Sequence, residues 1–262
     1  MESTAILQAA EVLAQSRIAG TTLAELAVEI RPASEGAAYA IQRAVHQQLR
    51  DAGCGSIAGY KIGCTTAVMQ RFLNIPNPCA GGVLASTVLP ETAVAAFDTY
   101  RHVGVECELA VRLGHGLAGA DVSREEAADA VQHAMAAIEI VDDRWHDYSA
   151  VSTPTLIADD FFAAGCVLGP PSESFDPLTL ASAQGAMQIN GETVGTGRGS
   201  DILGDPLQAL VWLAHCLHSH GEQLVAGQIV LLGSLVQTVW VPPGARVEAA
   251  VEGLGGASLT FV

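Results

Sequence analysis

Apolar residues follow one spacing near the N-terminus and another in the rest of the chain. Over residues 4–52 they recur every three or four positions, as at Ala38 and Ile41, which is the period of an amphipathic helix. Beyond this stretch, short apolar runs are separated by Gly, Pro and Asn, a pattern typical of β-strands joined by turns. We therefore expect an N-terminal helical region over residues 1–56 and a β-rich domain over residues 57–262.

Two helices are predicted within the β-rich part, over residues 123–138 and 205–220. The first begins at Ser123 with the sequence pattern of a capping box. Asn190-Gly191 predicts a tight hairpin turn between two strands. The sum is an α+β chain, in which a helical part precedes a mixed or antiparallel β body. Predicted strands cover residues 59–63, 82–88, 103–113, 162–168, 186–189, 228–232, 238–241, 246–251 and 257–261.

The composition limits the partners that the protein can have. Half of the 262 residues are hydrophobic and 15% are charged, so the chain can bury a sizeable core. The formal net charge is −16, which disfavours both nucleic acid and an anionic membrane surface as partners. The six cysteines form no CxxC pair, and the N-terminus lacks the basic start of a signal peptide. We expect a cytoplasmic protein with reduced thiols.

Three acidic residues in apolar surroundings are the main candidates for chemistry. Glu106 and Glu108 are two apart in a predicted strand, so their side chains share one face, and they repel unless a cation or water separates them. Glu139 is a third acid inside an apolar run, where an unpaired charge is costly. Three such carboxylates suit Mg²⁺ or Mn²⁺. Alternatively, the first two lie on a solvated strand face and Glu139 caps a helix end.

Lys61 is the second candidate because it is the chain's only lysine. The residues two positions away on either side are Gly59 and Gly63, and glycines allow a backbone or a ligand to approach closely. A lysine can hold an anion as a compact charge, or act as a base when it is desolvated. The alternative is that a composition rich in Ala and Arg leaves few lysines by chance.

Eight short motifs follow one another along the chain. They are Gly59-Tyr-Lys-Ile-Gly-Cys-Thr-Thr, Asn77-Pro-Cys-Ala-Gly-Gly-Val-Leu84, Val105-Glu-Cys-Glu-Leu-Ala, Ile138-Glu-Ile-Val-Asp-Asp-Arg144, Leu156-Ile-Ala-Asp159, Asn190-Gly-Glu, Gly204-Asp-Pro-Leu and Ala226-Gly-Gln-Ile-Val-Leu-Leu-Gly-Ser234. In this order they resemble the 2-keto-4-pentenoate hydratase and 4-oxalocrotonate decarboxylase branch of the fumarylacetoacetate hydrolase superfamily. The resemblance runs from Ala38 to the C-terminus.

The resemblance implies a fold, a site and an activity. The fold would be the superfamily's mixed β-roll, which forms the catalytic domain, with an N-terminal helical part. The activity would be a metal-dependent hydratase (a lyase) that adds water to a 2-hydroxy-2,4-dienoate or 2-oxo-4-enoate in the degradation of aromatic compounds. By matching the family's motifs, Glu106, Glu108 and Glu139 would bind Mg²⁺ or Mn²⁺, Lys61 would be the active-site lysine, and Gly233 and Ser234 would contact the keto acid.

Two departures from the family pattern leave alternatives open. Cys79 stands where hydratases of this branch often carry an acid, and Asp160-Phe161-Phe162 replaces a more polar sequence. The same site could therefore serve a decarboxylase or an acylpyruvate-type C–C hydrolase. The resemblance also implies a homo-oligomer, and possible partners include a hydratase–decarboxylase complex in which this chain is a structural subunit.

Overall fold

The N-terminal part consists of two helices that pack against each other. The computed structural model describes residues 1–73, 75–172 and 174–262. Helix α1 (Ser3–Ala19) ends at Gly20, whose left-handed backbone closes the last turn. Helix α2 (Glu35–Asp51) begins after Ser34, whose side chain accepts a hydrogen bond from the backbone of Ala37. The prediction of continuous helix over residues 4–52 was therefore wrong for the segment between the two helices.

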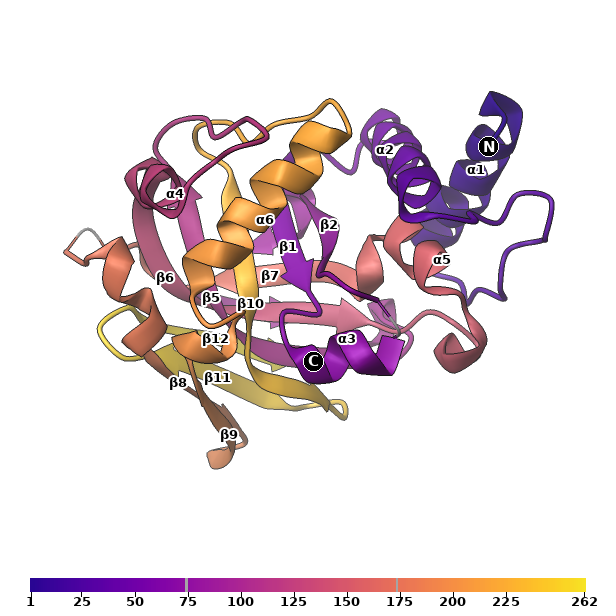
Figure 1. Ribbon diagram of the computed structural model, residues 1–262. Coiled ribbons are helices and arrows are strands. Elements are labelled where there is room, and N and C mark those ends of the chain that lie inside the picture. The colour runs from indigo at the N-terminus through magenta and orange to yellow at the C-terminus, as the bar shows by residue number, and fades with distance from the viewer. Residues whose placement is uncertain (74, 173) are drawn as a thin grey trace.

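A seven-stranded mixed sheet forms the centre of the molecule (Figure 1). Its order is β2-β1-β10-β5-β6-β7-β3. The β1–β10 and β3–β7 pairs are parallel and the others are antiparallel. Strands β2 and β7 lie near opposite ends of this order yet contact each other, so the sheet is rolled. The strands are β1 (Ile57–Gly63), β2 (Cys79–Leu84), β3 (Val88–Leu89), β5 (Val103–Leu113), β6 (Val131–Asp142), β7 (Ala163–Leu168) and β10 (Ile229–Trp240).

A second sheet of five strands packs against β5 and β6 (Figure 1). Its order is β4-β12-β11-β8-β9. Asn190 and Gly191 join β8 to β9 with positive φ values of 53° and 84°, so the predicted hairpin is confirmed. The strands are β4 (Thr92–Ala95), β8 (Gln184–Ile189), β9 (Glu192–Arg198), β11 (Arg246–Val251) and β12 (Gly255–Phe261).

Four further helices lie around the two sheets. Helix α6 (Pro206–Ser219) contacts β10 of the rolled sheet (Figure 1). Helix α5 (Thr153–Ala158) contacts α2 and so joins the helical part to the β body. The other two are α3 (Ala67–Leu73) and α4 (Arg124–Ala130). In the part of the chain that the structure describes, no helix has the length and apolar character needed to span a membrane.

Several predicted elements have different bounds in the structure. The helix predicted over residues 123–138 is wrong beyond residue 130, where the chain continues as β6. Glu139 therefore lies within a strand and does not cap a helix. The strands predicted over residues 228–232 and 238–241 are one strand, β10, because Gly233 lies at a register shift rather than a turn. Helices α3 and α5 and strands β4 and β6 were not predicted, and β9 was predicted only as the second strand of the Asn190-Gly191 hairpin.

One apolar core spans both parts of the chain. It includes Leu13 of α1, Ile41 of α2 and Phe261 of β12, all fully buried. A smaller cluster, which includes Met135, Ala137 and Leu231, lies on one face of the rolled sheet. The boundary expected after residue 56 falls in the connection from α2 to β1, and the division into two regions stays a prediction.

Candidate active site

Three carboxylates converge on one face of the rolled sheet. Glu106 and Glu108 extend from β5, and Glu139 lies directly opposite Glu106 on β6. Each offers an oxygen atom, and these atoms lie within 4.8 Å of one another. Because side chains alternate along a strand, the glutamates share their face with Ala137 and Met135 of the smaller apolar cluster. The structure thus brings together the three acids that the sequence singled out.

Burial and mutual repulsion raise the pKa of two of these carboxylates, Glu108 and Glu139. Glu108 and Glu139 are 1% and 2% exposed. Burial, followed by the charges of Glu139 and Glu106, raises the pKa of Glu108 well above its ordinary value. Burial also raises the pKa of Glu139 to about 7, although Lys61 partly opposes the shift. A divalent cation among the three side chains would favour their charged forms.

Neighbouring groups orient the carboxylates while leaving oxygen atoms available. The Gly233 backbone N–H donates a hydrogen bond of 2.8 Å to Oε2 of Glu108, and the Thr238 hydroxyl donates to Oε1 of Glu106. Oε1 of Glu139 is buried and faces the ammonium of Lys61 at 3.0 Å. Such oriented, hard oxygen donors fit a divalent cation such as Mg²⁺ or Mn²⁺.

Lys61 lies beside these acids on β1. Its Nζ is 3.0 Å from Oε1 of Glu139, and the residue is 3% exposed. Burial alone would lower the pKa of Lys61, but the negative charges of Glu139 and Glu106 outweigh it and raise the pKa above its ordinary value. The side chain is therefore an ammonium ion at neutral pH. A side chain at Gly81, the residue opposite Lys61 on β2, would clash with the backbone oxygen of Asp160.

Gly233 and Ser234 lie at the irregular part of β10 beside Glu108. Gly233 has a φ of 143°, and a Cβ there would lie 2.6 Å from Oγ1 of Thr65, so only glycine fits. The Ser234 hydroxyl donates to the backbone oxygen of Val236. Both groups already have partners within the protein, and their contact with a keto acid stays a prediction.

A left-handed turn at residues 160–162 lies beside the candidate site. The sequence marked these residues as a departure from the family pattern but did not predict the turn. Asp160, Phe161 and Phe162 have φ values of 54°, 50° and 66°, a conformation that costs about 1–2 kcal/mol per non-glycine residue. The Asp160 carboxylate accepts hydrogen bonds from the Gly82 backbone N–H at 2.8 Å and from Nε2 of His46 at 2.7 Å. The turn places the Phe161 ring with its centroid 5.3 Å from Nζ of Lys61.

Two arginines fix the residue that precedes this turn. Nε of Arg17 and an Nη of Arg144 donate to Oδ1 of Asp159 at 2.9 and 2.6 Å. Arg144 also donates to the Ser16 hydroxyl at 2.9 Å. Asp159 and Arg144 both stand in motifs of the family resemblance, but Arg17 does not, and nothing in the sequence pattern links it to this place. Helix α1 thereby supports the turn beside Lys61.

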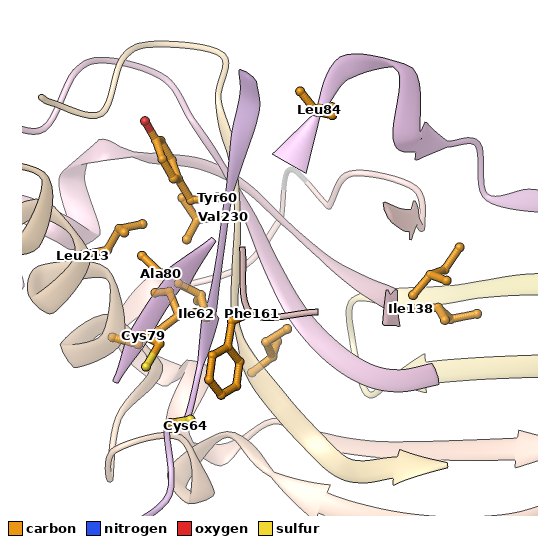
Figure 2. Close-up of a cluster of buried hydrophobic side chains, with 14 of the residues drawn as sticks. Tyr60, Ile62, Cys64, Cys79, Ala80, Leu84, Ile138, Phe161, Leu213 and Val230 are labelled. Atoms are coloured by element: carbon orange, nitrogen blue, oxygen red, sulfur yellow. The ribbon is translucent and has the colours of Figure 1, made fainter. Parts of the chain in front are cut away.

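Cys79 begins β2 opposite Gly63 and belongs to a buried cluster with Cys64, Ile62 and Phe161 (Figure 2). A hydrogen bond with Cys64 and burial both raise the pKa of the Cys79 thiol well above its ordinary value. The thiol is therefore neutral at pH 7. Hydratases of the family branch that this sequence resembles often have an acid at this position. Cys79 supplies no negative charge there.

Comparisons with known proteins find matches over most of this chain. The family model described as "Fumarylacetoacetate (FAA) hydrolase C-terminal" matches residues 73–262. A 2-hydroxyhexa-2,4-dienoate hydratase of Comamonas testosteroni is 32% identical over 82% of this chain and 81% of its own length. A 2-keto-4-pentenoate hydratase of Paraburkholderia xenovorans (strain LB400) is 31% identical over 97% of this chain and 94% of its own length.

The fold also matches a solved structure over the whole chain. The 4-oxalocrotonate decarboxylase from Pseudomonas putida G7, complexed with magnesium and adipate, superposes with a TM-score of 0.94. The alignment covers 100% of this chain and 99% of that one, at 22% sequence identity. The likeness shows that the two chains share their fold, including the helical N-terminal part.

Proposed function

The chain belongs to the fumarylacetoacetate hydrolase family, and on this premise we propose that it is a metal-dependent hydratase, a hydro-lyase that acts on 2-hydroxy-2,4-dienoates. Two relatives that match most of its length are named as hydratases of such compounds. The observation that carries the proposal is the convergence of three carboxylates beside the single buried ammonium of Lys61. The reaction belongs to the degradation of aromatic compounds.

Glu106, Glu108 and Glu139 are the proposed metal ligands. A cation held there would act as a Lewis acid toward the carboxylate and 2-oxo oxygens of the substrate. Three oxygen ligands leave positions for a substrate, which suits Mg²⁺ or Mn²⁺. Gly233 and Thr238 keep Glu108 and Glu106 in place through their hydrogen bonds.

Lys61 is the proposed catalytic residue, and it acts as a charge rather than as a base. In the reaction, the enol hydroxyl loses its proton and C5 of the dienoate gains one, which yields a 2-oxo-3-enoate. Water then adds its oxygen to C4 and a proton to C3, giving a 4-hydroxy-2-oxo acid. Negative charge develops on the 2-oxygen when the enol is deprotonated, and a fixed ammonium in a buried site stabilises that charge.

The remaining proposals concern location and assembly. The six cysteines are free thiols, as is usual for cytoplasmic enzymes, and we assign the protein to the cytoplasm. We propose that its ligand is a small 2-oxo acid and that nucleic acid and membranes are not partners, in agreement with the net charge of −16. The proposed assembly is a homo-oligomer, or a complex with a decarboxylase subunit.

A decarboxylase is the second candidate function, because the neutral Cys79 thiol stands near Lys61 in place of an acid. Loss of CO₂ from the distal end of a six-carbon 2-oxo-3-enedioate moves the electron pair of the broken C5–C6 bond through C3–C4 to the 2-oxygen. The product is a 2,4-dienolate, which the same ammonium would stabilise. Identifying the product separates the candidates. A hydroxy-keto acid indicates hydration, CO₂ indicates decarboxylation, and pyruvate indicates C–C hydrolysis.

The test is turnover of 2-hydroxypenta-2,4-dienoate by the purified protein. We expect EDTA to abolish activity and Mg²⁺ or Mn²⁺ to restore it. Lys61→Ala should lower kcat at least about 100-fold, as does removal of one group that stabilises an oxyanion. Glu192→Gln, a change at an exposed residue of β9, is the control. Activity that is indifferent to both EDTA and Lys61→Ala would contradict the proposal.

A further inference from the structure

The Phe161 ring occupies a fixed place beside the candidate site. Its centroid is 5.3 Å from Nζ of Lys61, and Lys61 in turn lies 3.0 Å from Glu139. A Cβ added at Gly63 would lie 3.1 Å from the ring, so the strand that carries Lys61 has a glycine where the ring rests. Phe161 is 7% exposed. An apolar wall therefore stands next to the ammonium that faces the carboxylates.

The backbone that holds this ring is constrained from three sides. The Asp160 carboxylate is bound by His46 of α2 and by the backbone of Gly82 in β2, and its other oxygen lies 3.6 Å from Arg17 of α1. These contacts keep three consecutive non-glycine residues left-handed, with Phe161 in the middle. Backbone conformations of this kind persist only where the surroundings enforce them, and they gather at ligand-binding positions.

Two more aromatic rings continue from Phe161 toward the surface. The Phe161 and Phe162 rings meet edge to face with centroids 5.4 Å apart, and Phe162 meets Tyr148 in the same way at 5.7 Å. Exposure rises along this row, from 7% at Phe161 to 36% at Tyr148. The row thus offers aromatic surface from the buried ammonium outward.

The basic groups that contact this turn are already paired. Arg17 and Arg144 bind Asp159, and His46 binds Asp160. The three basic side chains that bind the acids of this turn thus each have an acidic partner. A second carboxylate on a ligand would therefore meet aromatic rings rather than a free cation, and burying it there would be unfavourable.

From these observations we infer that Phe161 is a specificity-determining residue, and that the site selects 2-oxo acids whose distal end is apolar. The ring supports the carbon chain where it leaves the carboxylates and Lys61, and Phe162 and Tyr148 extend that support outward. A ligand of the same length with a terminal carboxylate is rejected. The inference rests on the proposed function, since the acid end of the ligand must occupy the proposed metal site.

Calorimetry with three ligands in the presence of Mn²⁺ tests the inference. Oxalate reports the metal site alone, 2-oxohexanoate adds an apolar chain, and 2-oxoadipate ends a chain of equal length in a carboxylate. For the unaltered protein we expect 2-oxohexanoate to bind at least about tenfold more tightly than 2-oxoadipate. Phe161→Ala should lower the ratio of 2-oxohexanoate affinity to oxalate affinity about tenfold, because apolar contact is lost. Phe161→Leu, which keeps apolar volume, should lower it less and guards against a folding defect in the alanine variant.

Each contrary result has a distinct meaning. If oxalate does not bind with Mn²⁺, the proposed function fails. If oxalate binds but Phe161→Ala and Phe161→Leu leave the ratio unchanged, or if 2-oxoadipate binds as tightly as 2-oxohexanoate, only the assignment of Phe161 fails. Trp240, which stacks on His102 and is 41% exposed, is the comparison. A ratio that falls in Trp240→Ala instead of Phe161→Ala would overturn the inference.

Discussion

Thr238 fixes Glu106, the least buried of the three carboxylates, by donating a hydrogen bond from its hydroxyl. Thr238→Val keeps the shape of the side chain and removes only this donor. We expect Mn²⁺ affinity to fall about 10- to 100-fold, as is typical when a group that orients a metal ligand is lost. Titration calorimetry measures the change. Thr92→Val, a change at an exposed residue of β4, should have no effect, and equal affinities for all three proteins would contradict this role.

Gly233 combines a backbone constraint with a contact to a carboxylate. In Gly233→Ala, the new Cβ would lie 2.6 Å from the Thr65 hydroxyl at a φ of 143°, so the strand must shift and the hydrogen bond to Glu108 must weaken. We expect the free energy of unfolding to fall by about 1–3 kcal/mol and Mn²⁺ affinity to fall about tenfold. Urea unfolding and calorimetry measure the two effects.

The control for this change is Gly36→Ala. Gly36 lies in α2, where an added Cβ would meet no atom within 4 Å. The free energy of unfolding of Gly36→Ala should stay within about 1 kcal/mol of the value for the unaltered protein. If Gly233→Ala behaved like Gly36→Ala, the strand would be more adaptable than its contacts indicate.

Residue patterns predicted the candidate site better than its surroundings. Glu106 and Glu108 stand out because alternation along a strand places two acids on one face, and Lys61 stands out because it is unique. The placement of Thr238 and Phe161 depends on contacts between segments more than 90 residues apart, such as Thr238 with Glu106 at a separation of 132. Periodicity carries no information about such contacts.

At the scale of elements, ion pairs differ sharply in their environment. Arg144 joins α1 to the end of α5 through Ser16 and Asp159, and its side chain is 9% exposed. Arg144→Met would leave the buried Asp159 with Arg17 as its remaining partner. We expect the free energy of unfolding to fall by about 3 kcal/mol, because a buried charge loses half of its compensation.

Arg246→Met is the matched change at an exposed pair. Arg246 and Glu248 lie 2.7 Å apart, but their side chains are 64% and 40% exposed. The loss of stability there should stay below about 1 kcal/mol. Urea unfolding of Arg144→Met and Arg246→Met under the same conditions measures the free energy of unfolding of each. Similar losses for both would mean that burial does not distinguish these pairs.

The β6 strand shows how packing overrides local preference. Residues 131–138 contain three alanines and a methionine, which favour helix in isolation, and a capping box precedes them. The capping box does begin a helix, α4, but the chain becomes a strand at Val131 because β5 and β7 pair with it on both sides. Pairing partners distant in sequence decide this element, which explains why a helix was predicted over its first part.

For the molecule as a whole, the sequence indicated the class of fold. It did not indicate that the central sheet is rolled or how the helical part contacts it. The change in spacing near residue 57 coincides with the passage from α2 to β1, the first strand of the mixed sheet. The sheet rolls so that β2 reaches β7, and Gly81 of β2 leaves room for the backbone of Asp160, which precedes β7. The joint between the N-terminal helices and the β body, meaning their contact at Asp160, depends on Arg17 of α1 and His46 of α2, which both contact this carboxylate. Neither feature has a local signature.

Asp160 is the group through which pH should act on this joint. Burial alone would raise the pKa of Asp160, but His46, Arg17 and the Gly82 N–H lower it, and the net pKa lies below its ordinary value of 3.8. A lowered pKa in the folded state means that the charged carboxylate stabilises the protein above about pH 4 and loses this effect as the pH falls through the folded-state pKa. At pH 7, Asp160→Asn should lower the free energy of unfolding by about 1.5–3 kcal/mol.

The pH dependence separates the charge of Asp160 from its shape. Asparagine keeps an oxygen for the Gly82 N–H but cannot titrate, so the stability difference between the unaltered protein and Asp160→Asn reports the charge of Asp160. It should shrink as the pH falls below the ordinary carboxyl value, because the unaltered protein alone then takes up a proton at this position. Urea midpoints measured at intervals from pH 7 to pH 3 follow the difference. A difference that persists unchanged to pH 3 would mean that the side chain acts through packing, and the left-handed turn would then be held without its charge.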